Sequence, residues 1–209
     1  MFYEKLRDKY IAIDGVIGVG KTTLTKFLCQ QYSLPMILEV VEENPFLSKF
    51  YEDMERWGFQ TQLFFLVSRF DQQEILKKIL SRGRGLVSDY TFEKDQLFAH
   101  LTLKGDHLKL YDRIFNILYE QVPKPDLIIY LYASVDILMS RIALRDRPFE
   151  RKMSRNYISM LHDAYENHFN KYSNENRTKI LRIDTTNIDF VKKEKDQNII
   201  IEALEEKLQ

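Results

Sequence analysis

Short apolar runs alternate with longer amphipathic stretches along this chain. The runs predict strands over residues 10–14, 36–41, 85–89, 127–132 and 178–183. Helical spacing of apolar residues predicts helices over 21–32, 45–57, 59–82, 95–104, 106–121, 135–145, 151–172 and 197–208. Strands that alternate with helices are typical of a parallel sheet with helices on both faces. We therefore expect residues 1–209 to form a single α/β domain around a five-stranded parallel sheet.

Proline marks two of the expected helix boundaries. Asn44 followed by Pro45 has the pattern of an N-cap with proline at the first helical position. Pro123 and Pro125 are expected to end a helix before the fourth strand, because proline disfavours helical backbone at the residue before it.

A glycine-rich segment joins the first strand to the following helix. Residues 15–22 read GVIGVGKT and match G-x-x-x-x-G-K-[ST] in the strand–turn–helix context that this motif requires. Backbone N–H groups converge on phosphate oxygens in such a turn, and the helix N-terminus adds partial positive charge. A purely structural glycine turn would not explain Lys-Thr in this register. We expect a nucleoside triphosphate here, bound by Gly15, Gly18, Gly20, Lys21, Thr22 and Thr23, with Thr22 also binding Mg²⁺.

Carboxylates follow the second and third strands, at the sheet edge where ligands of parallel sheets gather. Asp89 ends the third strand, where a P-loop enzyme places a second Mg²⁺-associated carboxylate. A helix N-cap is the alternative interpretation. Phosphoryl transfer to a hydroxyl also needs a carboxylate near the acceptor oxygen. Glu39, Glu42 and Glu43 all qualify by position, and spacing does not choose between them.

Three arginines cluster around the end of the helix expected over 135–145. Arg141 and Arg145 share a helix face, and Arg147 follows just before Pro148. Converging guanidiniums suit a lid, over about 145–151, that neutralises a transferring phosphoryl group. The alternative is a solvated basic helix end, which the helix dipole favours.

Composition and hydropathy bear on the kinds of partner and on the location to be expected. Lys+Arg and Asp+Glu both number 31, so the zero net charge does not indicate nucleic acid or an anionic membrane as a partner. No apolar run is long enough to cross a bilayer, and the charged N-terminus does not resemble a signal peptide. With Cys29 as the single cysteine, we expect a cytoplasmic protein. The aromatic-rich stretch over 50–62 could line a nucleobase pocket or simply belong to the core.

Taken together, these segments resemble the deoxynucleoside kinase family, and within it the bacterial deoxyguanosine and deoxyadenosine kinases. The likeness covers nearly the whole chain and includes EENPFL at 42–47, PKP at 123–125 and RDRPFE at 145–150. It implies a P-loop NTPase-type fold with an Arg-rich lid. It also implies ATP- and Mg²⁺-dependent phosphorylation of the 5′-hydroxyl of a deoxynucleoside, in nucleotide salvage.

The resemblance also assigns roles. Glu39 matches the family's catalytic base, with Glu42 as the runner-up, and Lys21 and Arg145 complete the expected catalytic set. Tyr51 and Glu150 would hold the 3′-hydroxyl. At the base, the resemblance implies Gln62 at the base edge, Arg69 and Asp95 as a purine-reading pair, and Phe98 or Phe92 as the stacking ring. At the phosphates, it implies Asp89 beside the metal and Arg145 and Arg147 as a clamp, with Arg141 on the donor side.

One position departs from the family pattern. The family commonly has an arginine after the acidic residue of strand three, and it helps to hold the 5′-hydroxyl. Tyr90 stands there in this chain, so either another group supplies the charge or Glu39 acts alone. The Asp-Tyr pair resembles a deoxyguanosine-kinase-like subgroup, which favours deoxyguanosine over deoxyadenosine.

The resemblance leaves alternatives in function and assembly. It implies a homodimer, or a heterodimer with a related subunit. The runner-up functions are a nucleoside monophosphate kinase of thymidylate-kinase type and a non-catalytic nucleotide-binding subunit. Tyr90 disfavours the first, because an acceptor phosphate needs a cation there. The second rests on Tyr90 alone.

Overall fold

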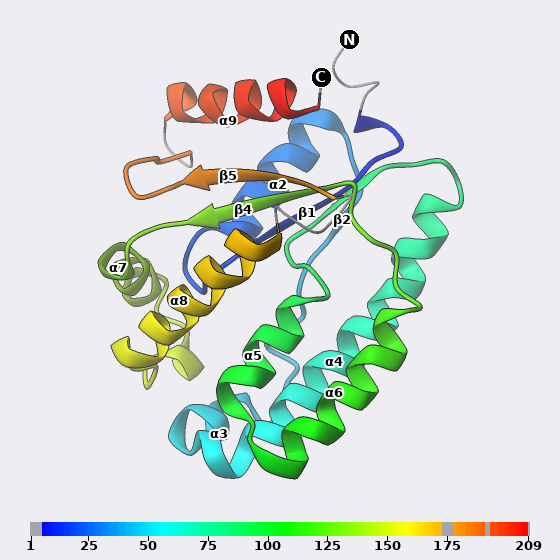
Figure 1. Ribbon diagram of the computed structural model, residues 1–209. Coiled ribbons are helices and arrows are strands. Elements are labelled where there is room, and N and C mark those ends of the chain that lie inside the picture. Colours follow the sequence, from blue (N-terminus) through cyan, green and yellow to red (C-terminus); the bar gives the residue numbers. More distant parts are fainter. Residues whose placement is uncertain (1–5, 173–177, 191–192, 209) are drawn as a thin grey trace.

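The computed structural model describes residues 6–172, 178–190 and 193–208. Within these ranges the strands form one five-stranded sheet in the order β2-β3-β1-β4-β5, with every neighbouring pair parallel (Figure 1). The predicted fold class is therefore confirmed. The strands are β1 (Tyr10–Gly15), β2 (Met36–Ile37), β3 (Leu86–Ser88), β4 (Leu127–Tyr132) and β5 (Lys179–Asp184).

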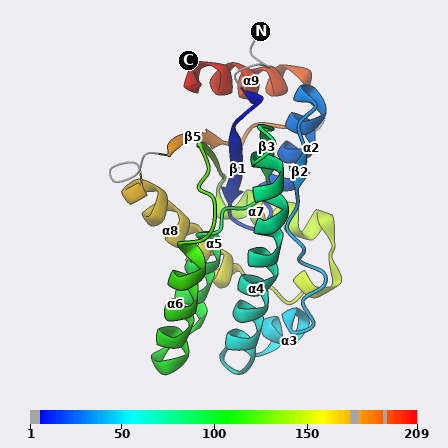
Figure 2. The ribbon, with the colours of Figure 1, turned by 90° about the vertical axis from the view of Figure 1, so that its right-hand side faces the viewer.

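Helices cover the sheet and extend beyond it. α4, α5 and α6 run side by side, away from the strands, in both views (Figures 1 and 2). The helices are α2 (Lys21–Tyr32), α3 (Leu47–Glu52), α4 (Met54–Leu80), α5 (Lys94–Thr102), α6 (Gly105–Tyr119), α7 (Val135–Arg145), the 3₁₀ turn η1 (Pro148–Glu150), α8 (Arg155–Tyr172) and α9 (Glu194–Lys207).

The core lies on both faces of the central strands. All six residues of β1 are buried, as expected for a strand with helices on each side. A second apolar cluster, with Leu66, Tyr111 and Phe115 among its buried residues, joins α4 and α6. The helices that extend from the sheet are thereby held rigid, so that α4 and α5 can carry side chains for a site at the carboxyl edge of the strands.

The prediction for the second strand is wrong in length. It extends only over Met36–Ile37 instead of residues 36–41. After Ile37, side chains take over the backbone hydrogen bonds: Gln72 Nε2 donates to the carbonyl of Leu38, and Glu39 N–H donates to Asp89 Oδ1. Because these partners replace a strand neighbour, the chain leaves the sheet at Leu38 and brings Glu39 over its edge.

The boundary predicted between helices 45–57 and 59–82 is also wrong. The break lies at Asp53, whose Oδ1 accepts the N–H of Arg56 at 3.0 Å and caps α4. Gly58 lies inside α4, where an added β-carbon would come within 3.2 Å of Leu103. The glycine therefore serves close packing and does not end a helix. Upstream, Asn44 accepts the N–H of Phe46 in a turn, and α3 begins only at Leu47.

The helix predicted over 151–172 begins later than expected. A 3₁₀ turn over Pro148–Glu150 follows α7, and α8 begins at Arg155. Ser154 Oγ accepts the N–H of Tyr157 at 3.1 Å, as an N-cap side chain does. The bounds of α2, β4 and α7 agree with prediction, and the elements not yet discussed differ by at most three residues at an end.

Candidate active site

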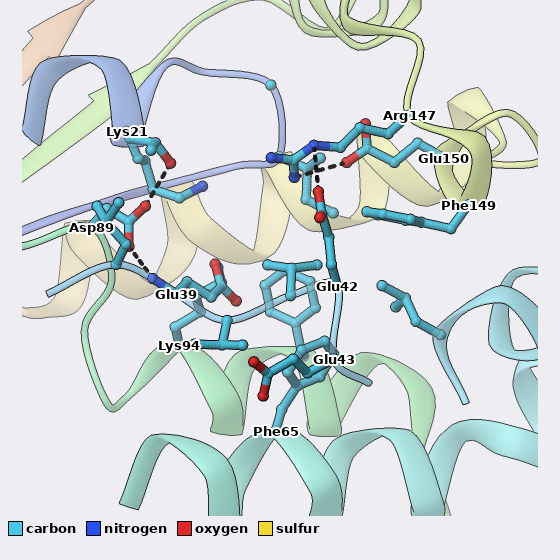
Figure 3. A pocket seen from close by; sticks show the side chains of 18 of the residues that line it. Lys21, Glu39, Glu42, Glu43, Phe65, Asp89, Lys94, Arg147, Phe149 and Glu150 are labelled. Atoms are coloured by element: carbon cyan, nitrogen blue, oxygen red, sulfur yellow. Dashed lines mark hydrogen bonds and ion pairs between the residues drawn. The ribbon is translucent and has the colours of Figure 1, made fainter. Parts of the chain in front are cut away.

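A cleft of about 540 Å³ opens at the carboxyl edge of the sheet. Its walls come from the segment after β1, the loop after β2, α3, α4, the segment after β3, α5 and the turn between α7 and α8. In Figure 3, Lys21 and Asp89 lie at one end and Arg147, Phe149 and Glu150 at the other, with Glu39 between them. Most of the predicted site residues line it: Gly18, Gly20, Lys21, Thr22, Thr23, Glu39, Tyr51, Gln62, Arg69, Asp89, Asp95, Phe98, Arg145, Arg147 and Glu150.

The P-loop forms one end of the cleft. A β-carbon at Gly15 would collide with the carbonyl of Leu131, and Gly20 has a left-handed φ of 107°, so both positions need glycine. Lys21 Nζ folds back over the loop and donates to the carbonyls of Gly15 and Val16 at 2.7 and 3.2 Å. Burial, and after it the nearby charge of Lys94, lower the pKa of Lys21 to about 8, although Glu39, Asp14 and Asp89 act in the opposite direction. A buried, weakly compensated ammonium at a helix N-terminus is suited to an incoming phosphate.

Asp89 connects the P-loop to Glu39. Its Oδ2 accepts the hydroxyl of Thr22 at 2.5 Å, and its Oδ1 accepts the N–H of Glu39 at 2.6 Å (Figure 3). The structure therefore brings together the side chains of Thr22 and Asp89, the two residues expected beside Mg²⁺. Asp89 makes no N-cap of α5, which begins at Lys94 after Glu93.

Four buried charged side chains meet next to the P-loop. Glu39 accepts from Arg69 through Oε1 and from Lys94 through Oε2, the latter at 2.6 Å. Arg69 also pairs with Asp95. Lys94, Asp95 and Arg69 are each no more than about 5% exposed. The chain thus carries two cations and two carboxylates from three segments into one desolvated cluster, in which the charges balance.

The cations decide the ionisation of Glu39. Burial alone would raise the pKa of its carboxyl, but Lys94, Arg69 and Lys21 outweigh burial and hold that pKa well below the usual range. Glu39 is therefore a carboxylate at every physiological pH. Its exposure and its place in the cleft leave it accessible to a ligand.

Aromatic and amide groups form the deeper end of the cleft. Phe98 lines it, whereas Phe92 is buried and stacked against Phe115 at 5.6 Å between ring centroids. Of the two predicted stacking rings, the structure therefore brings only Phe98 to the cleft. Gln62 donates through Nε2 to Thr102 Oγ1 at 3.2 Å, and the Thr102 hydroxyl donates to the carbonyl of Phe98.

The segment after α7 closes the cleft. Glu150 is buried and accepts two hydrogen bonds from Arg145, at 2.5 and 3.1 Å. Arg147 lies 3.8 Å from Glu42 and 4.0 Å from Glu150. Arg141 is separate from this group: it donates to the carbonyls of Val19 and Thr185 and does not line the cleft. The structure therefore brings together two of the three predicted lid arginines, and Arg141 braces the P-loop from behind.

The three candidate glutamates differ sharply in environment. Glu42 and Glu43 are exposed, and the nearest cation to Glu42 is Arg147 at 3.8 Å. Glu39 is mostly buried and has two cationic partners. The geometry therefore favours Glu39 as the carboxylate that meets an acceptor group.

Sequence reasoning missed Lys94, Phe65 and Phe149, which all line the cleft. Tyr90 does not line the cleft, and its phenol donates to Gln72 Oε1 at 2.7 Å. Tyr90 therefore does not supply the cation that the family arginine would place near Glu39. Lys94 is the first cationic residue after Tyr90 in the sequence. That position was a signal that could have led to it.

Two kinds of feature are absent from the described part of the chain. Residues 6–172, 178–190 and 193–208 hold no group of three or more His, Cys, Asp or Glu side chains placed to bind a metal by themselves. Mg²⁺ needs no such group when phosphate oxygens and waters complete its shell. Over the same residues, no helix combines the length and the apolar character needed to cross a bilayer.

Comparison with known proteins agrees with the fold. A P-loop fold with a carboxylate beside the loop and arginines across the cleft is suited to phosphoryl transfer. The family model for deoxynucleoside kinases matches residues 11–209, and the chain belongs to that family. It is therefore an enzyme of the deoxynucleoside kinase class.

Relatives carry more than one substrate name. The chain is 39% identical to the deoxyguanosine kinase of Bacillus subtilis (strain 168), over 90% of this chain and 91% of that protein. It is 33% identical to the deoxyadenosine/deoxycytidine kinase of the same organism, over 95% and 92%. The structure of deoxyadenosine kinase from M. mycoides with bound dATP has a TM-score of 0.80 at 24% identity, covering 94% of this chain and 98% of that one. This last likeness concerns the fold.

Proposed function

We propose that this enzyme transfers the γ-phosphoryl group of ATP to the 5′-hydroxyl of a purine deoxynucleoside, with deoxyguanosine preferred over deoxyadenosine. The observation that carries the proposal is the buried Glu39–Arg69–Asp95 chain of contacts. It links a carboxylate beside the P-loop to a pair of charged groups deep in the same cleft.

In the proposed mechanism, the P-loop amides and Lys21 bind the triphosphate, and the sugar lies across Glu39. Glu39 orients the 5′-hydroxyl and takes its proton as the new P–O bond forms. A carboxylate with a low pKa is a weak base, but phosphoryl transfer passes through a loose transition state in which the nucleophile has lost little of its proton. Positioning of the hydroxyl and electrostatic stabilisation therefore contribute more than base strength.

The lid would bind the phosphoryl group and the sugar. The Arg145 guanidinium has more N–H donors than the two it uses on Glu150, so others remain for phosphate oxygens. Tyr51 lines the cleft, and burial raises the pKa of its phenol, which keeps a neutral hydroxyl ready to bond the 3′-hydroxyl beside Glu150. Arg147, at the cleft edge, completes the proposed clamp.

Thr22 and Asp89 are the proposed Mg²⁺ ligands. Their oxygens lie 2.5 Å apart, so one small cation could contact both once the Thr22 hydroxyl turns its hydrogen away. Mg²⁺ would neutralise charge on the β- and γ-phosphates. A hydroxyl and a carboxylate are the hard oxygen donors that it prefers, so the residues present fit the ion.

The base end supports a purine, and guanine in particular. Arg69 Nε and Asp95 Oδ2 are buried and have no hydrogen-bond partner within the described residues. Guanine presents O6 and N7 as acceptors for an arginine and N–H donors for a carboxylate. Adenine offers no O6, so one donor of Arg69 would lose its partner, which is a penalised outcome in a buried site. The name of the B. subtilis deoxyguanosine kinase supports the same preference.

The alternatives have less support. A nucleoside monophosphate kinase would need a cation for the acceptor phosphate beyond Asp89, where the uncharged Tyr90 stands. A non-catalytic subunit would not need Lys21, Glu39 and Arg145 in one cleft. A single domain over 1–209, a dimer, a cytoplasmic location and a role in salvage stay predictions.

The proposal is tested by comparing deoxyguanosine with dGMP as acceptor, with [γ-³²P]ATP as donor and Mg²⁺ present. We expect labelled dGMP from deoxyguanosine, and no labelled dGDP from dGMP. Conversion of dGMP alone would replace the proposal with the monophosphate kinase. Tight binding of both substrates without any product would favour the non-catalytic subunit.

A further inference from the structure

Lys94 is a buried cation in the wall of the cleft beside Glu39, and the family pattern assigns it no role. It is 4% exposed and lines the cleft. Its Nζ lies 2.6 Å from Glu39 Oε2 and 5.4 Å from the centre of the Phe98 ring. In Figure 3 the Lys94 side chain extends along the cleft wall below the Glu39 carboxylate.

The position of Lys94 is unfavourable for a merely structural lysine. It is the first residue of α5, and the partial positive charge of a helix N-terminus repels a cation. Burial of an ammonium adds a desolvation penalty. Arg69 is shared between Glu39 and Asp95, so Lys94 balances the charge of the cluster. Because this balance is supplied from an unfavourable place directly beside the carboxylate that meets the acceptor, Lys94 invites a functional explanation as well.

Lys94 lies at the junction between the donor and acceptor halves of the cleft. Among the charged neighbours of Lys21, Lys94 lowers its pKa most, after the effect of burial itself. The two ammonium groups are therefore close enough to repel each other while the cleft is empty. A phosphoryl group passing from the P-loop to a hydroxyl on Glu39 would carry its negative charge between them.

Within the described residues, the chain places no other cation directly after β3. Tyr90 is buried and uses its hydroxyl on Gln72. Thr91 fixes the backbone at Lys94, because its carbonyl and its Oγ1 both accept the backbone N–H of Lys94, each at 3.3 Å. The turn after Asp89 thus fixes the start of α5 and directs the lysine toward Glu39.

We infer that Lys94 is a catalytic residue, whose ammonium donates a hydrogen bond to the 5′-oxygen of the acceptor while it holds Glu39 in place. In the step, a bond forms between the 5′-oxygen and the γ-phosphorus, and the bond from that phosphorus to the bridging oxygen breaks. The electron pair leaves with the nucleoside diphosphate, and the hydroxyl proton goes to Glu39. Lys94 keeps its proton throughout and offsets the charge of the transferring group. The inference rests on the proposed role of Glu39.

The test compares Lys94→Gln and Lys94→Arg with the unaltered enzyme, using ATP and deoxyguanosine. Removal of one donor aimed at developing charge typically reduces kcat by about 10²–10³-fold. We expect that loss in Lys94→Gln with KM for deoxyguanosine changed by less than about fivefold, because the donor acts mainly in the transition state. Lys94→Arg keeps the charge and should recover at least about tenfold of kcat. Lys109→Gln is the control, since Lys109 is an exposed lysine on α6.

A second variant distinguishes loss of the ammonium group from misfolding of the variant. In Lys94→Ala, added ethylammonium should restore part of kcat in a saturable way, whereas ethanol should not. Glu39→Gln, measured in parallel, distinguishes failure of the Lys94 inference from failure of the proposed function of Glu39. An inactive Glu39→Gln beside a Lys94→Gln whose kcat stays within twofold would overturn the role of Lys94 alone. Full activity of Glu39→Gln would overturn the proposed function of Glu39 and this inference with it.

Discussion

Glu39→Gln is the substitution that tests most directly whether Glu39 acts on the acceptor hydroxyl. Glutamine keeps the volume of glutamate and one acceptor oxygen, but it loses the charge. Both carboxylate oxygens of Glu39 accept from cations, Arg69 on one side and Lys94 on the other. The amide NH₂ must therefore face one of these donors, and that contact becomes repulsive.

The expected loss has two parts. A general base contributes about 10²–10⁴-fold to the rate, which corresponds to about 3–5 kcal/mol of transition-state stabilisation. Loss of a charge-assisted contact to Lys94 or Arg69 adds disorder around the acceptor hydroxyl. We expect kcat to fall by at least about 10³-fold, while the dissociation constant for deoxyguanosine changes by less than about tenfold, since Arg69 keeps its pairing with Asp95 and no group proposed to contact the base is replaced.

The assay is steady-state phosphorylation of deoxyguanosine beside calorimetric binding of the same nucleoside. Glu42→Gln is the matched comparison, because Glu42 is exposed and its nearest cation is Arg147 at 3.8 Å. We expect its kcat to stay within a few-fold of the unaltered enzyme. A large loss in Glu42→Gln together with near-normal turnover in Glu39→Gln would refute the assignment.

Three further predictions follow from individual contacts. Asp95→Asn should reduce kcat/KM for deoxyguanosine more than for deoxyadenosine. Arg69→Gln should also reduce kcat, because Arg69 contacts Glu39 as well as Asp95. Equal effects of both changes on both nucleosides would contradict this. The pKa of Lys21, lowered to about 8, means that the ammonium is charged below that pH and loses its charge above it. ATP affinity measured by calorimetry should therefore weaken between pH 7 and pH 9 by up to about tenfold, with proton uptake at pH 9, and a flat profile would contradict it. Asp53→Ala should lower the free energy of urea unfolding by about 1 kcal/mol through loss of the α4 cap, and an unchanged unfolding midpoint would show that the cap is dispensable.

Much of the fold could be predicted because its signals are local. Each of the five apolar runs and the glycine motif is a contiguous stretch of sequence, and periodicity gave the bounds of α2 and α7 to the residue. The errors occur where distant side chains decide. Gln72 and Asp89 end β2 by taking hydrogen bonds that a strand neighbour would have made. Leu103 packs over Gly58, so the glycine that looked like a helix end lies inside α4.

The residues of the candidate site also divide into those that local sequence predicted and those that tertiary packing decided. The P-loop residues are contiguous, and Glu39 could be assigned by its resemblance to a motif. Lys94 was missed: it is the first cation after Tyr90, but a linear pattern does not show that a lysine in the first turn of α5 reaches a carboxylate from the loop after β2. Arg141 shows the reverse: its spacing from Arg145 suggested a common task, but Thr185 and Val19 hold its guanidinium elsewhere. Sequence spacing predicted which residue types are present, and tertiary packing decided which of them meet.

The measurement that tests the central claim most directly is a competition assay. ATP, Mg²⁺ and equal concentrations of deoxyguanosine, deoxyadenosine, deoxycytidine and thymidine are incubated with the enzyme, and the initial rates of formation of the four 5′-monophosphates give the ratios of kcat/KM. We expect both purine products to exceed both pyrimidine products, with dGMP formed fastest. A pyrimidine product formed fastest, or no turnover of any nucleoside, would contradict it.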